Sequence, residues 1–488
     1  MQNPTGPAHG PNLPAAAEYD VIVIGAGPTG ENVADRVVKA GLSAVVVESE
    51  RVGGECSYFA CIPSKALLRP AAALAEARAV AGAREAVTGL LDVPAVLARR
   101  EAFVSDLRDD GQVAWLKSAG IDLVRGWGRL VGERRVEVDG DDGATVLAAR
   151  HAVVLCTGSS AVMPTVPGLA GIGAWTSREA TTAGAAPDRL TVLGGGVVGC
   201  EMAAAWSALG SQVTMLVRSE GLLPSWEPFA AAQVADGLRR DGVGIRTGVE
   251  VERVVRENST GVVMAYLADG STVESAELLV ATGRSPRTAG LGLETAGLEP
   301  GGRLPVDDSC RVTTVPDGWL YAAGDVNQRS PLTHMGKYQA RTCAAAIVAR
   351  ADGHPARPVP WAPWSATADH HAVPQVIFTR PEAAAVGLTE EQARRAGLPV
   401  RAVEYPIGDV AGASLFADGY QGHAKLVVDE QRSVVVGCTL VGPGVGELIH
   451  AATVAVVGEV PLERLWHAVP AFPTMSEIWL RLLEQYWL

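Results

Sequence analysis

The amino-acid sequence predicts an α/β protein with two similar units built on parallel sheets, followed by an α+β segment. Two observations carry this prediction. A glycine-rich turn between an apolar strand and a helix begins at Gly25, and the same arrangement returns at Gly194. Residues 361–488 instead mix apolar strands with helices and lack such a turn. The chain of 488 residues is long enough for about three domains.

The composition is that of a globular protein, with 48% apolar and 19% charged residues. The net charge of −13 predicts an acidic surface, which repels phosphate backbones and anionic membranes. We therefore expect no nucleic-acid partner. No run of about 18 apolar residues occurs, so we expect no membrane span either.

Both the N-terminus and the cysteines indicate the compartment. Residues 1–18 contain four prolines and no signal-peptide pattern, which predicts a disordered tail. The seven cysteines are odd in number, and Cys56 and Cys61 are the close pair. This usage favours a reducing cytoplasm over a secreted disulfide framework.

The first unit, residues 18–49, has a strand, a turn, a helix and a second strand. Gly25, Gly27 and Gly30 form the turn motif G-x-G-x-x-G. The first glycine permits the tight turn, the second lets a pyrophosphate approach, and the third packs the helix on the strand. Glu48 ends the second strand, where a carboxylate accepts a hydrogen bond from a ribose hydroxyl. The unit therefore predicts a Rossmann-like dinucleotide site.

The chain between the two units is predicted to be first helical and then an antiparallel sheet. Residues 64–119 have helical spacing and few turn signals, so they are predicted to be helical. Residues 124–149 alternate in short stretches, which predicts an antiparallel meander with a turn at 139–143.

The second unit starts near residue 190 and repeats the motif with Gly194, Gly196 and Gly199. The acid is missing: Val217 ends the second strand and Arg218 follows it. An arginine here pairs with a 2′-phosphate, so the second site favours NADPH over NADH. The alternative is a surface arginine that happens to follow a strand.

Cys56 and Cys61 stand five residues apart, after Gly54 and before Lys65. On a helix this spacing is about a turn and a half and lets two sulfurs meet in a disulfide. A helix N-terminus also lowers the pKa of a thiol and so favours the reactive thiolate. The alternative is a pair of unrelated buried cysteines.

Several phrases occur in one order along the chain: GAGPTG, GGECSYFACIPSK, VVLCTGSS, GGGVVGCE, ATGRSP, YAAGDV and VGLTEEQA. From residue 19 to about 480, the chain resembles the FAD-dependent pyridine nucleotide–disulfide oxidoreductases, such as dihydrolipoamide dehydrogenase, glutathione reductase and mercuric reductase. The resemblance implies FAD on the first unit, NAD(P)H on the second, and a homodimer whose C-terminal domain completes the partner's active site. The implied domains are residues 19–160 with 285–360 for FAD, 161–284 for NAD(P)H, and 361–488 for dimerisation.

The resemblance also implies roles for individual residues. Cys61 corresponds to the thiol nearest the flavin and Cys56 to the thiol that meets substrate. Lys65 corresponds to the flavin-side lysine and Glu201 to the acid that pairs with it. Further residues that the resemblance assigns to the cofactors are Gly54, Gly158 and Asp325 for FAD, and Gly283 and Arg284 for NAD(P)H. No metal site is implied.

One departure from the family concerns proton transfer. The disulfide reductases have a His followed by Pro, and a Glu five residues after the His. Here Phe472 stands at the His position and Glu477 is retained. Phenylalanine cannot move a proton. Because residues 469–479 are largely apolar, we expect Phe472 to keep its pocket apolar and a histidine there to damage the native reaction. The alternative is that the His was lost by drift from an ordinary disulfide reductase, in which case a histidine at this position should restore disulfide turnover, since Glu477 is retained.

Three hypotheses follow. The first is an NADPH-dependent FAD oxidoreductase that reduces a small-molecule acceptor through Cys56 and Cys61. The second keeps the cofactors and bypasses the disulfide, as in a quinone-type reductase. A separate alternative is a C–S-cleaving enzyme resembling 2-ketopropyl-coenzyme M oxidoreductase/carboxylase, since that enzyme also has Phe at the His position. The third is a non-catalytic redox-sensing flavoprotein. Mercury reduction is disfavoured, because the chain does not end in a cysteine pair.

Overall fold

The structure, a computed structural model, describes residues 17–141, 143–258 and 261–488. The predicted tail, residues 1–18, lies outside the described residues except for Ala17 and Glu18, which begin strand β1 (Ala17–Ile24). The chain forms two compact units. Unit 1 comprises Met1–Cys56, Arg108–Ser160 and Pro286–Thr367, and unit 2 comprises Ser57–Leu107, Ala161–Ser285 and Ala368–Leu488.

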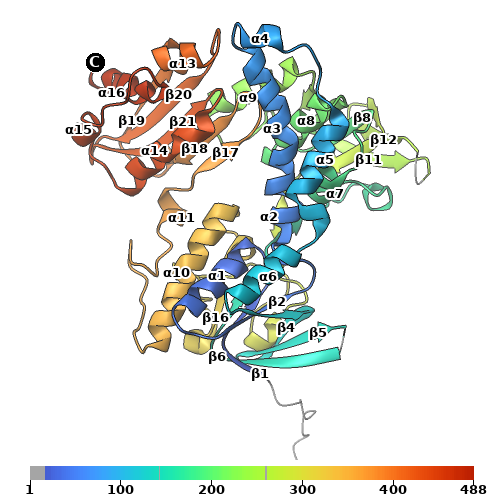
Figure 1. The fold of residues 1–488 in the computed structure, drawn as a ribbon, viewed down its shortest axis with the longest axis vertical. Coiled ribbons are helices and arrows are strands. Elements are labelled where there is room, and N and C mark those ends of the chain that lie inside the picture. Colours follow the sequence, from blue (N-terminus) through green and yellow to red (C-terminus); the bar gives the residue numbers. More distant parts are fainter. Residues whose placement is uncertain (1–16, 142, 259–260) are drawn as a thin grey trace, which may run out of the picture. The chain divides into compact units, whose positions relative to one another are not determined.

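Unit 1 is built on a mixed sheet with the strand order β3-β2-β1-β6-β5-β4, and β16 pairs with β6 (Figure 1). Strands β1, β2, β3, β6 and β16 run parallel, whereas β5 pairs antiparallel with both of its neighbours, β6 and β4. The predicted strand–helix–strand unit and the predicted meander are therefore confirmed. The bounds are β2 (Ala44–Glu48), β3 (Asp122–Arg125), β4 (Trp127–Gly132), β5 (Arg135–Gly140), β6 (Gly143–Leu155) and β16 (Leu320–Ala322).

The apolar pattern explains why these elements form. The second half of β1 is buried on both faces, and helix α1 (Pro28–Lys39) buries Gly30, Val33, Ala34 and Val37 on one side. Helix α1 lies beside α10 (Thr333–Ala351) (Figure 1). The other helices of unit 1 are α6 (Asp110–Ser118) and the 3-10 turns η3 (Leu293–Ala296), η4 (Pro316–Gly318) and η5 (Asp325–Asn327).

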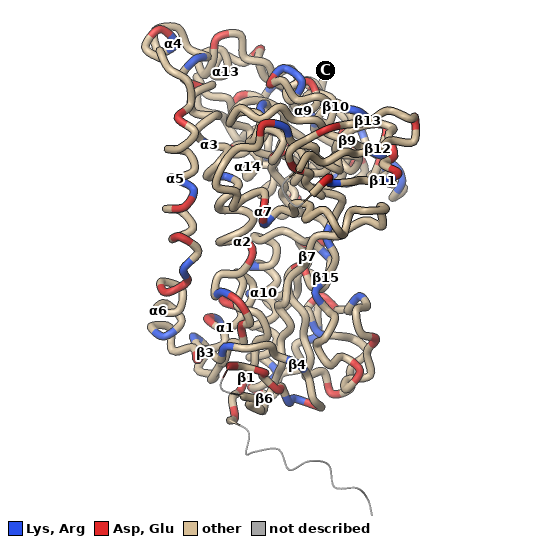
Figure 2. Tube along the Cα trace, turned by 90° about the vertical axis from the view of Figure 1, so that its right-hand side faces the viewer, with Lys and Arg blue, Asp and Glu red and all other residues tan. Residues whose placement is uncertain are grey.

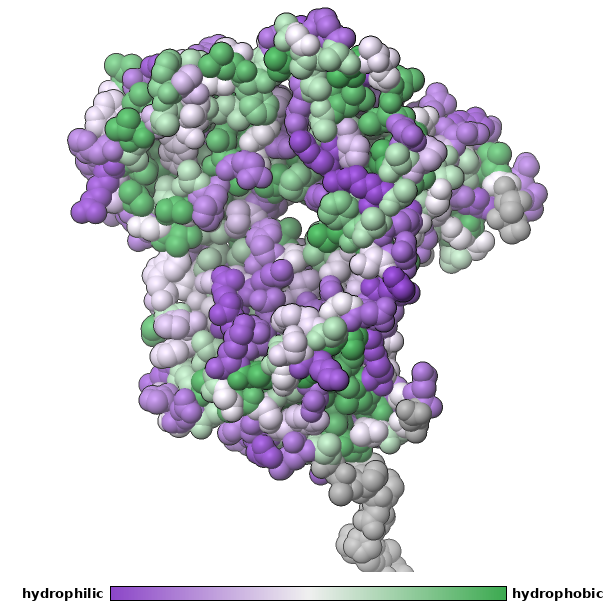
Figure 3. Space-filling model, in the orientation of Figure 1, coloured by the Kyte–Doolittle hydropathy of each residue, from purple (hydrophilic) through white to green (hydrophobic). Residues whose placement is uncertain are grey.

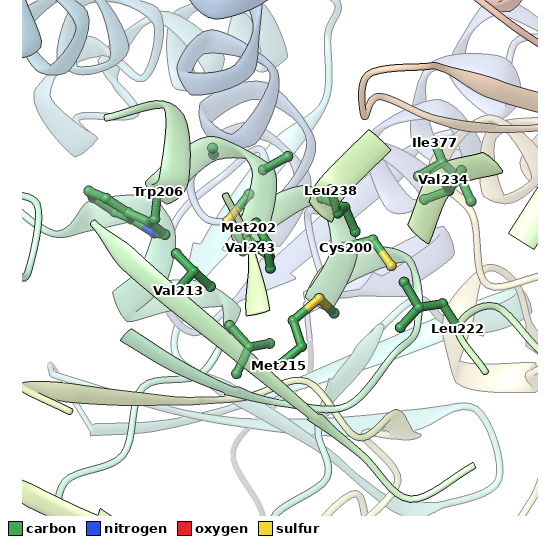
Figure 4. Close-up of a cluster of buried hydrophobic side chains, with 14 of the residues drawn as sticks. Cys200, Met202, Trp206, Val213, Met215, Leu222, Val234, Leu238, Val243 and Ile377 are labelled. Atoms are coloured by element: carbon green, nitrogen blue, oxygen red, sulfur yellow. The ribbon is translucent and has the colours of Figure 1, made fainter. Parts of the chain in front are cut away.

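Unit 2 contains a second parallel sheet with the order β10-β9-β8-β14, which confirms the predicted repeat. Its strands and helices are β8 (Arg189–Leu193), α8 (Val197–Ala208), β9 (Gln212–Val217), α9 (Pro228–Arg240), β10 (Gly244–Thr247) and β14 (Glu277–Val280). Figure 4 shows the core of this part, where Met202 and Trp206 of α8 lie with Val213 and Met215 of β9 and Leu238 of α9. An antiparallel sheet of β11 (Val251–Arg256), β12 (Val263–Leu267) and β13 (Thr272–Ser275) follows in the chain.

The C-terminal part of unit 2 is an antiparallel sheet with helices, in agreement with the predicted α+β segment. The strand order is β17-β18-β21-β20-β19. The strands are β17 (Gln375–Ile377), β18 (Ala383–Gly387), β19 (Val400–Pro406), β20 (His423–Asp429) and β21 (Val434–Val441). The helices are α11 (Ala368–His371), α12 (Glu390–Arg395), η6 (Ile407–Asp409), α13 (Ala411–Phe416), α14 (Val445–Val457), α15 (Leu462–Leu465), η7 (Met475–Glu477) and α16 (Ile478–Trp487).

The segment predicted to be helical is helical, with one difference at its start. Helix α2 (Gly54–Tyr58) ends before α3 (Cys61–Arg78) begins, and Ala60 between them has φ −135° and ψ −96°. Cys56 and Cys61 therefore do not share one continuous helix, which corrects the spacing argument. Pro63 lies in the first turn of α3, where proline is well accepted, and so favours a helix that starts at Cys61; Pro70 is accommodated inside the same helix. The remaining elements are α4 (Ala83–Ala86), α5 (Val93–Phe103), η1 (Ser105–Leu107), β7 (Ser159–Ala161), η2 (Leu169–Gly171), α7 (Ser177–Thr182) and β15 (Arg284–Pro286).

The charged residues of both signs are interspersed along the chain, as Figure 2 shows for one side. Within residues 17–141, 143–258 and 261–488, no helix is long and apolar enough to cross a membrane. In the same ranges, no group of three or more His, Cys, Asp or Glu side chains is placed to hold a metal ion.

Candidate functional site

The glycine-rich turn of unit 1 brings separate stretches of backbone together. Gly25 has a φ of +102°, and a Cβ there would clash with the carbonyl of Cys156. Gly54 has a φ of +57°, and its Cβ would lie 2.8 Å from the Cα of Gly27. A side chain is excluded at both positions. The backbone at the start of α1 therefore stays accessible to an anion such as a pyrophosphate.

Glu48 is the last residue of β2 and is fixed beside this turn. Its Oε2 accepts a hydrogen bond from the backbone N–H of Ala26, and its Oε1 accepts one from the backbone N–H of Glu50. Both N···O distances are 2.7 Å. Burial raises the pKa of the Glu48 carboxyl, although these two N–H groups act in the opposite direction. Each oxygen keeps a second lone pair, so Glu48 is able to accept a ribose hydroxyl.

Glu31 lies one residue beyond Gly30 in the first turn of α1, and the sequence analysis did not single it out. Its Oε1 is buried, and no donor in the described part of the chain hydrogen-bonds to it. A buried polar oxygen without a partner fits a site in which a bound group supplies one. With the glycine turn and Glu48, this feature fits the ADP portion of FAD.

Asp325 lies beyond the end of β16, near the carboxyl ends of β1 and β6, where α/β sheets bind ligands. Its Oδ2 accepts the hydroxyl of Ser159 at 2.6 Å. Gly324 before it has a φ of +83°, and a Cβ there would lie 2.7 Å from Oγ1 of Thr29 on α1. Gly158, the other predicted glycine of this edge, also has a positive φ, of +73°.

Cys56 lies in α2, and Cys61, five residues further along the chain, is the first residue of α3. All seven cysteines are described, and these two are the ones that are not buried. Burial raises the pKa of Cys156 and Cys438 to about 12, which leaves those thiols unreactive. Cys61 has the helix N-terminal position that favours a thiolate.

Thr333, the first residue of α10, was missed by the sequence analysis. Its hydroxyl donates a hydrogen bond to Sγ of Cys56, with an O···S distance of 3.1 Å. A hydroxyl donor stabilises a thiolate more than a neutral thiol. Sequence alone gives no signal for this contact, because 277 residues separate the two side chains.

Lys65 and Glu201 are brought together within unit 2. Nζ of Lys65 on α3 lies 2.7 Å from Oε2 of Glu201 on α8, whose side chain is 5% exposed. Oε1 of Glu201 accepts the N–H of Phe378 at 3.1 Å, and Nζ of Lys65 lies 4.8 Å from the centre of the Phe378 ring. The lysine is therefore held in one position, with its charge balanced.

The second glycine turn resembles the first in its geometry. Gly194 has a φ of +115°, and a Cβ at Gly199 would lie 2.5 Å from the carbonyl oxygen of Gly194. A Cβ at Gly195 would lie 2.8 Å from Cγ1 of Val217, which ends β9 as Glu48 ends β2. Arg218, directly after the strand, is exposed.

Three other residues were predicted for the NAD(P)H site: Gly196, Gly283 and Arg284. Gly196 caps the N-terminus of α8 with an extended backbone and without a side-chain cap. Gly283 has a φ of +138°, and Nη1 of Arg284 lies 3.4 Å from the hydroxyl of Ser177.

Phe472 lies in the loop before η7, and Glu477 is the last residue of η7, directly before α16. Phe472 is 76% exposed, so the apolar surroundings that the sequence suggested do not bury it within this chain. Glu477 is 8% exposed; its Oε1 pairs with Arg481 at 2.6 Å, whereas its Oε2 is buried with no hydrogen-bond partner in the described residues. Apolar residues are visible at the surface of this C-terminal part (Figure 3, upper left), and the exposed ones include Trp466, Val469, Phe472, Trp487 and Leu488.

Two dinucleotide turns, an accessible cysteine pair and a lysine paired with a buried glutamate define an oxidoreductase that uses FAD and NAD(P)H. The chain belongs to the pyridine nucleotide–disulphide oxidoreductases: residues 19–347 match the model of that family, and residues 373–482 match the model of its dimerisation domain. The dimerisation domain supports a homodimer.

Relatives cover nearly the whole chain. The sequence is 33% identical over 463 residues to a dihydrolipoyl dehydrogenase of Thermus scotoductus, covering 94% of this chain and 95% of the relative. It is 29% identical to a mercuric reductase of Staphylococcus aureus, covering 94% and 81%. Among solved structures, the HOCl-induced flavoprotein disulfide reductase RclA of Escherichia coli superposes with a TM-score of 0.80 at 26% identity, covering 96% of this chain and 99% of RclA.

Proposed function

We propose that the protein is a cytoplasmic homodimeric reductase in which electrons pass from NADPH to the Cys56–Cys61 disulfide and on to a small-molecule acceptor. The observation that carries the proposal is the cysteine pair: among seven cysteines, the two that are not buried are the two that follow the first dinucleotide turn. The proposal assigns FAD to residues 19–160 and 285–360, NADPH to 161–284, and dimerisation to 361–488.

The two electrons of NADPH are the number needed to reduce the Cys56–Cys61 disulfide to two thiols. Bound FAD supplies the two-electron step between the nicotinamide and the disulfide. The disulfide then becomes two thiols, and reduction of the acceptor restores the disulfide. The hydroxyl of Thr333 and the N-terminus of α3 both favour thiolates, which are the nucleophilic form. The Lys65–Glu201 pair keeps a fixed cation in the same unit as Cys61.

The proposal predicts distinct spectra for the two cysteine variants. Reduction by NADPH under anaerobic conditions should produce a long-wavelength thiolate-to-flavin charge-transfer band. Cys61→Ser should abolish this band, because it removes the thiol assigned to the flavin. Cys56→Ser should show the band without reductant, because Cys61 then has no disulfide partner.

The matched control is Cys438→Ala, which removes a buried thiol whose pKa burial raises to about 12. That variant should keep the spectrum of the unmodified protein. If neither Cys56→Ser nor Cys61→Ser changes the spectrum, the cysteine pair is not the electron carrier and the proposal fails.

A second candidate function is supported by Phe472. Without an imidazole at this position, the chain lacks the proton carrier that thiol–disulfide exchange uses in the family. Electrons would then pass to a quinone-type acceptor without the disulfide. Retained NADPH–quinone activity in Cys56→Ser would favour this route, and its loss would favour the thiol route.

A C–S-cleaving reaction would appear with thioether substrates, and no turnover with any acceptor would favour a redox sensor.

The preference for NADPH is predicted to depend on Arg218. A charge-assisted hydrogen bond contributes about 1.5–3 kcal/mol, which corresponds to about 10- to 100-fold in affinity. Arg218→Glu should therefore erase a preference of about tenfold or more, measured as the ratio of kcat/KM for NADPH and NADH. Arg239→Glu on the exposed surface of α9 is the matched control and should leave the ratio unchanged. A tenfold preference of the unmodified protein for NADH would contradict the assignment.

A further inference from the structure

Glu31 has no role in the function proposed above, yet its position is unusual for a carboxyl group. It lies on α1 in the first turn after the glycine motif, and its Oε1 is enclosed by the protein. No hydrogen bond to this oxygen and no ion pair with Glu31 is formed within the described ranges. An enclosed acceptor without a donor costs free energy, so the arrangement needs a partner from outside the chain.

The charged groups around Glu31 come from two other elements. Glu48 at the end of β2 disfavours a second negative charge here, and Lys337 on α10 favours it. Glu48 is itself held by the N–H groups of Ala26 and Glu50 and is attracted by Arg125. Burial is the largest effect on Glu31, and it raises the pKa of this carboxyl to about 7.

The surrounding backbone makes this a phosphate-binding region. The start of α1 is the positive end of the helix dipole, and Gly27 caps it without a side chain. Thr29 packs between Gly324 and Gly336, which brings the loop before Asp325 and the start of α10 against the same turn. Two carboxylates beside a pyrophosphate would repel it. A carboxylic acid would instead donate a hydrogen bond to it.

We propose that Glu31 binds the ADP portion of FAD as a neutral carboxylic acid that donates its proton in a hydrogen bond to an oxygen of the nucleotide. This inference goes beyond the proposed function, since it concerns only how FAD is held. It implies that FAD is bound most tightly on the acid side of neutrality. Deprotonation removes the donor and adds a negative charge beside the phosphates, so FAD is released more readily as the pH rises.

The experiment measures the release of FAD from the holoenzyme, without NADPH or any acceptor. Diluted holoenzyme is followed by the increase of flavin fluorescence between pH 6 and pH 8.5. By linkage, a group with a pKa near 7 in the FAD-free protein weakens binding about tenfold between pH 6 and pH 8. Because this pKa belongs to the FAD-free protein, the effect appears in the dissociation constant, which the fluorescence reports once the diluted protein has come to equilibrium. We expect the dissociation constant to be about tenfold higher at pH 8 than at pH 6.

The Glu31 variants separate the donor from the charge. Glu31→Gln keeps a donor and cannot ionise, so the dissociation constant of FAD should stay low and independent of pH. Glu31→Leu removes the donor, so the dissociation constant should be higher and also independent of pH. Lys337→Met removes the cation that favours the ionised form, so the midpoint of the pH dependence should move to higher pH. This last shift keeps the test decisive if either Glu31 variant does not fold.

The controls lie on the same two helices. Asp35→Asn removes an acid that pairs with Lys39 on the outer side of α1, and His334→Gln removes the imidazole near the start of α10. Both should keep the pH dependence of the unmodified protein. The inference is overturned if release from the unmodified protein does not depend on pH, or if Glu31→Gln keeps the same slope. Because no cysteine chemistry is measured, failure here is distinguishable from failure of the proposed function.

Discussion

Replacement of Lys425 by Met is expected to lower the free energy of unfolding of unit 2 by about 3–5 kcal/mol. The Lys425 ammonium lies 3.2 Å from Oε2 of Glu227, and both side chains are buried, at 8% and 3% exposed. It also lies 2.6 Å from Glu390 and 3.3 Å from Glu404. Methionine has a similar length and no charge, so the Glu227 carboxylate stays buried without its cation. Urea-induced unfolding followed by circular dichroism measures the loss.

Two controls test whether burial causes this loss. Lys39→Met breaks the exposed pair of Lys39 with Asp35, where the lysine side chain is 69% exposed, and should cost less than about 1 kcal/mol. The double variant Lys425→Met/Glu227→Leu removes both buried charges and should recover most of the stability. An unchanged urea midpoint in Lys425→Met would show that the buried charges do not stabilise the unit.

The contribution of this cluster should depend on pH with a definite sign. Hydrogen bonds from Lys425 and Arg394 hold the pKa of Glu390 below its ordinary value. Burial raises the pKa of Glu404, but hydrogen bonds from His423 and Lys425 outweigh it, so this pKa is also lowered. A lowered carboxyl pKa gives stability that is present above the unfolded value of about 4.3 and is lost as the pH falls through the folded value. The difference between unmodified protein and Lys425→Met should therefore shrink in acid.

At alkaline pH, the titration of Lys425 decides whether the cluster's contribution to stability rises or falls. Burial lowers the pKa of Lys425, but the hydrogen bonds that its ammonium donates to Glu390 and Glu227 outweigh this effect, so the pKa is raised. A raised lysine pKa gives stability that is present below the unfolded value of about 10.4 and is lost as the pH rises through the folded value. The stability difference should therefore stay constant between about pH 6 and pH 9.

Local spacing predicted those parts of the site that one strand–turn–helix segment contains. In each unit, the residue that ends the second strand follows the glycine turn within about 25 residues; it is Glu48 for β2 and Val217 for β9. The strand–turn–helix–strand geometry therefore fixes where this residue lies relative to the glycines. The break before α3 was missed because five-residue spacing was read as one helix. Pro63 was the available signal, since proline is favoured in the first turn of a helix.

Contacts between distant segments could not be predicted in this way. The cluster at Lys425 joins side chains from four segments of unit 2, and Thr333 reaches Cys56 across 277 residues. Tertiary packing alone decides such contacts. Glu31 was overlooked for another reason: it follows the glycine motif directly, but an acid in the first turn of a helix is ordinary. Only its burial without a partner distinguishes it.

Replacement of Phe472 by His is expected to raise NADPH-dependent disulfide reduction by about one to two orders of magnitude. The sequence favoured damage to the native reaction, because the surroundings of Phe472 are apolar. In the structure its side chain is 76% exposed, so an imidazole there would not be desolvated within this chain. The buried Oε2 of Glu477 has no hydrogen-bond partner among the described residues, and an imidazole N–H could supply one. Arg481 holds the other carboxylate oxygen in place.

The increase in disulfide reduction by Phe472→His should depend on Oε2 of Glu477. An imidazole oriented by a carboxylate takes the proton of one thiol and returns it to another, which Phe472 cannot do. Turnover of lipoamide and of glutathione disulfide by Phe472→His measures the gain. Phe472→Ala should show none, which separates base catalysis from the simple removal of a ring. Phe472→His/Glu477→Gln should lose most of the gain, because the amide presents either a weaker acceptor or a donor to the ring. Equal turnover in Phe472→His and Phe472→Ala would mean that Glu477 does not orient a base at this position, and that the route without the disulfide fits this protein better.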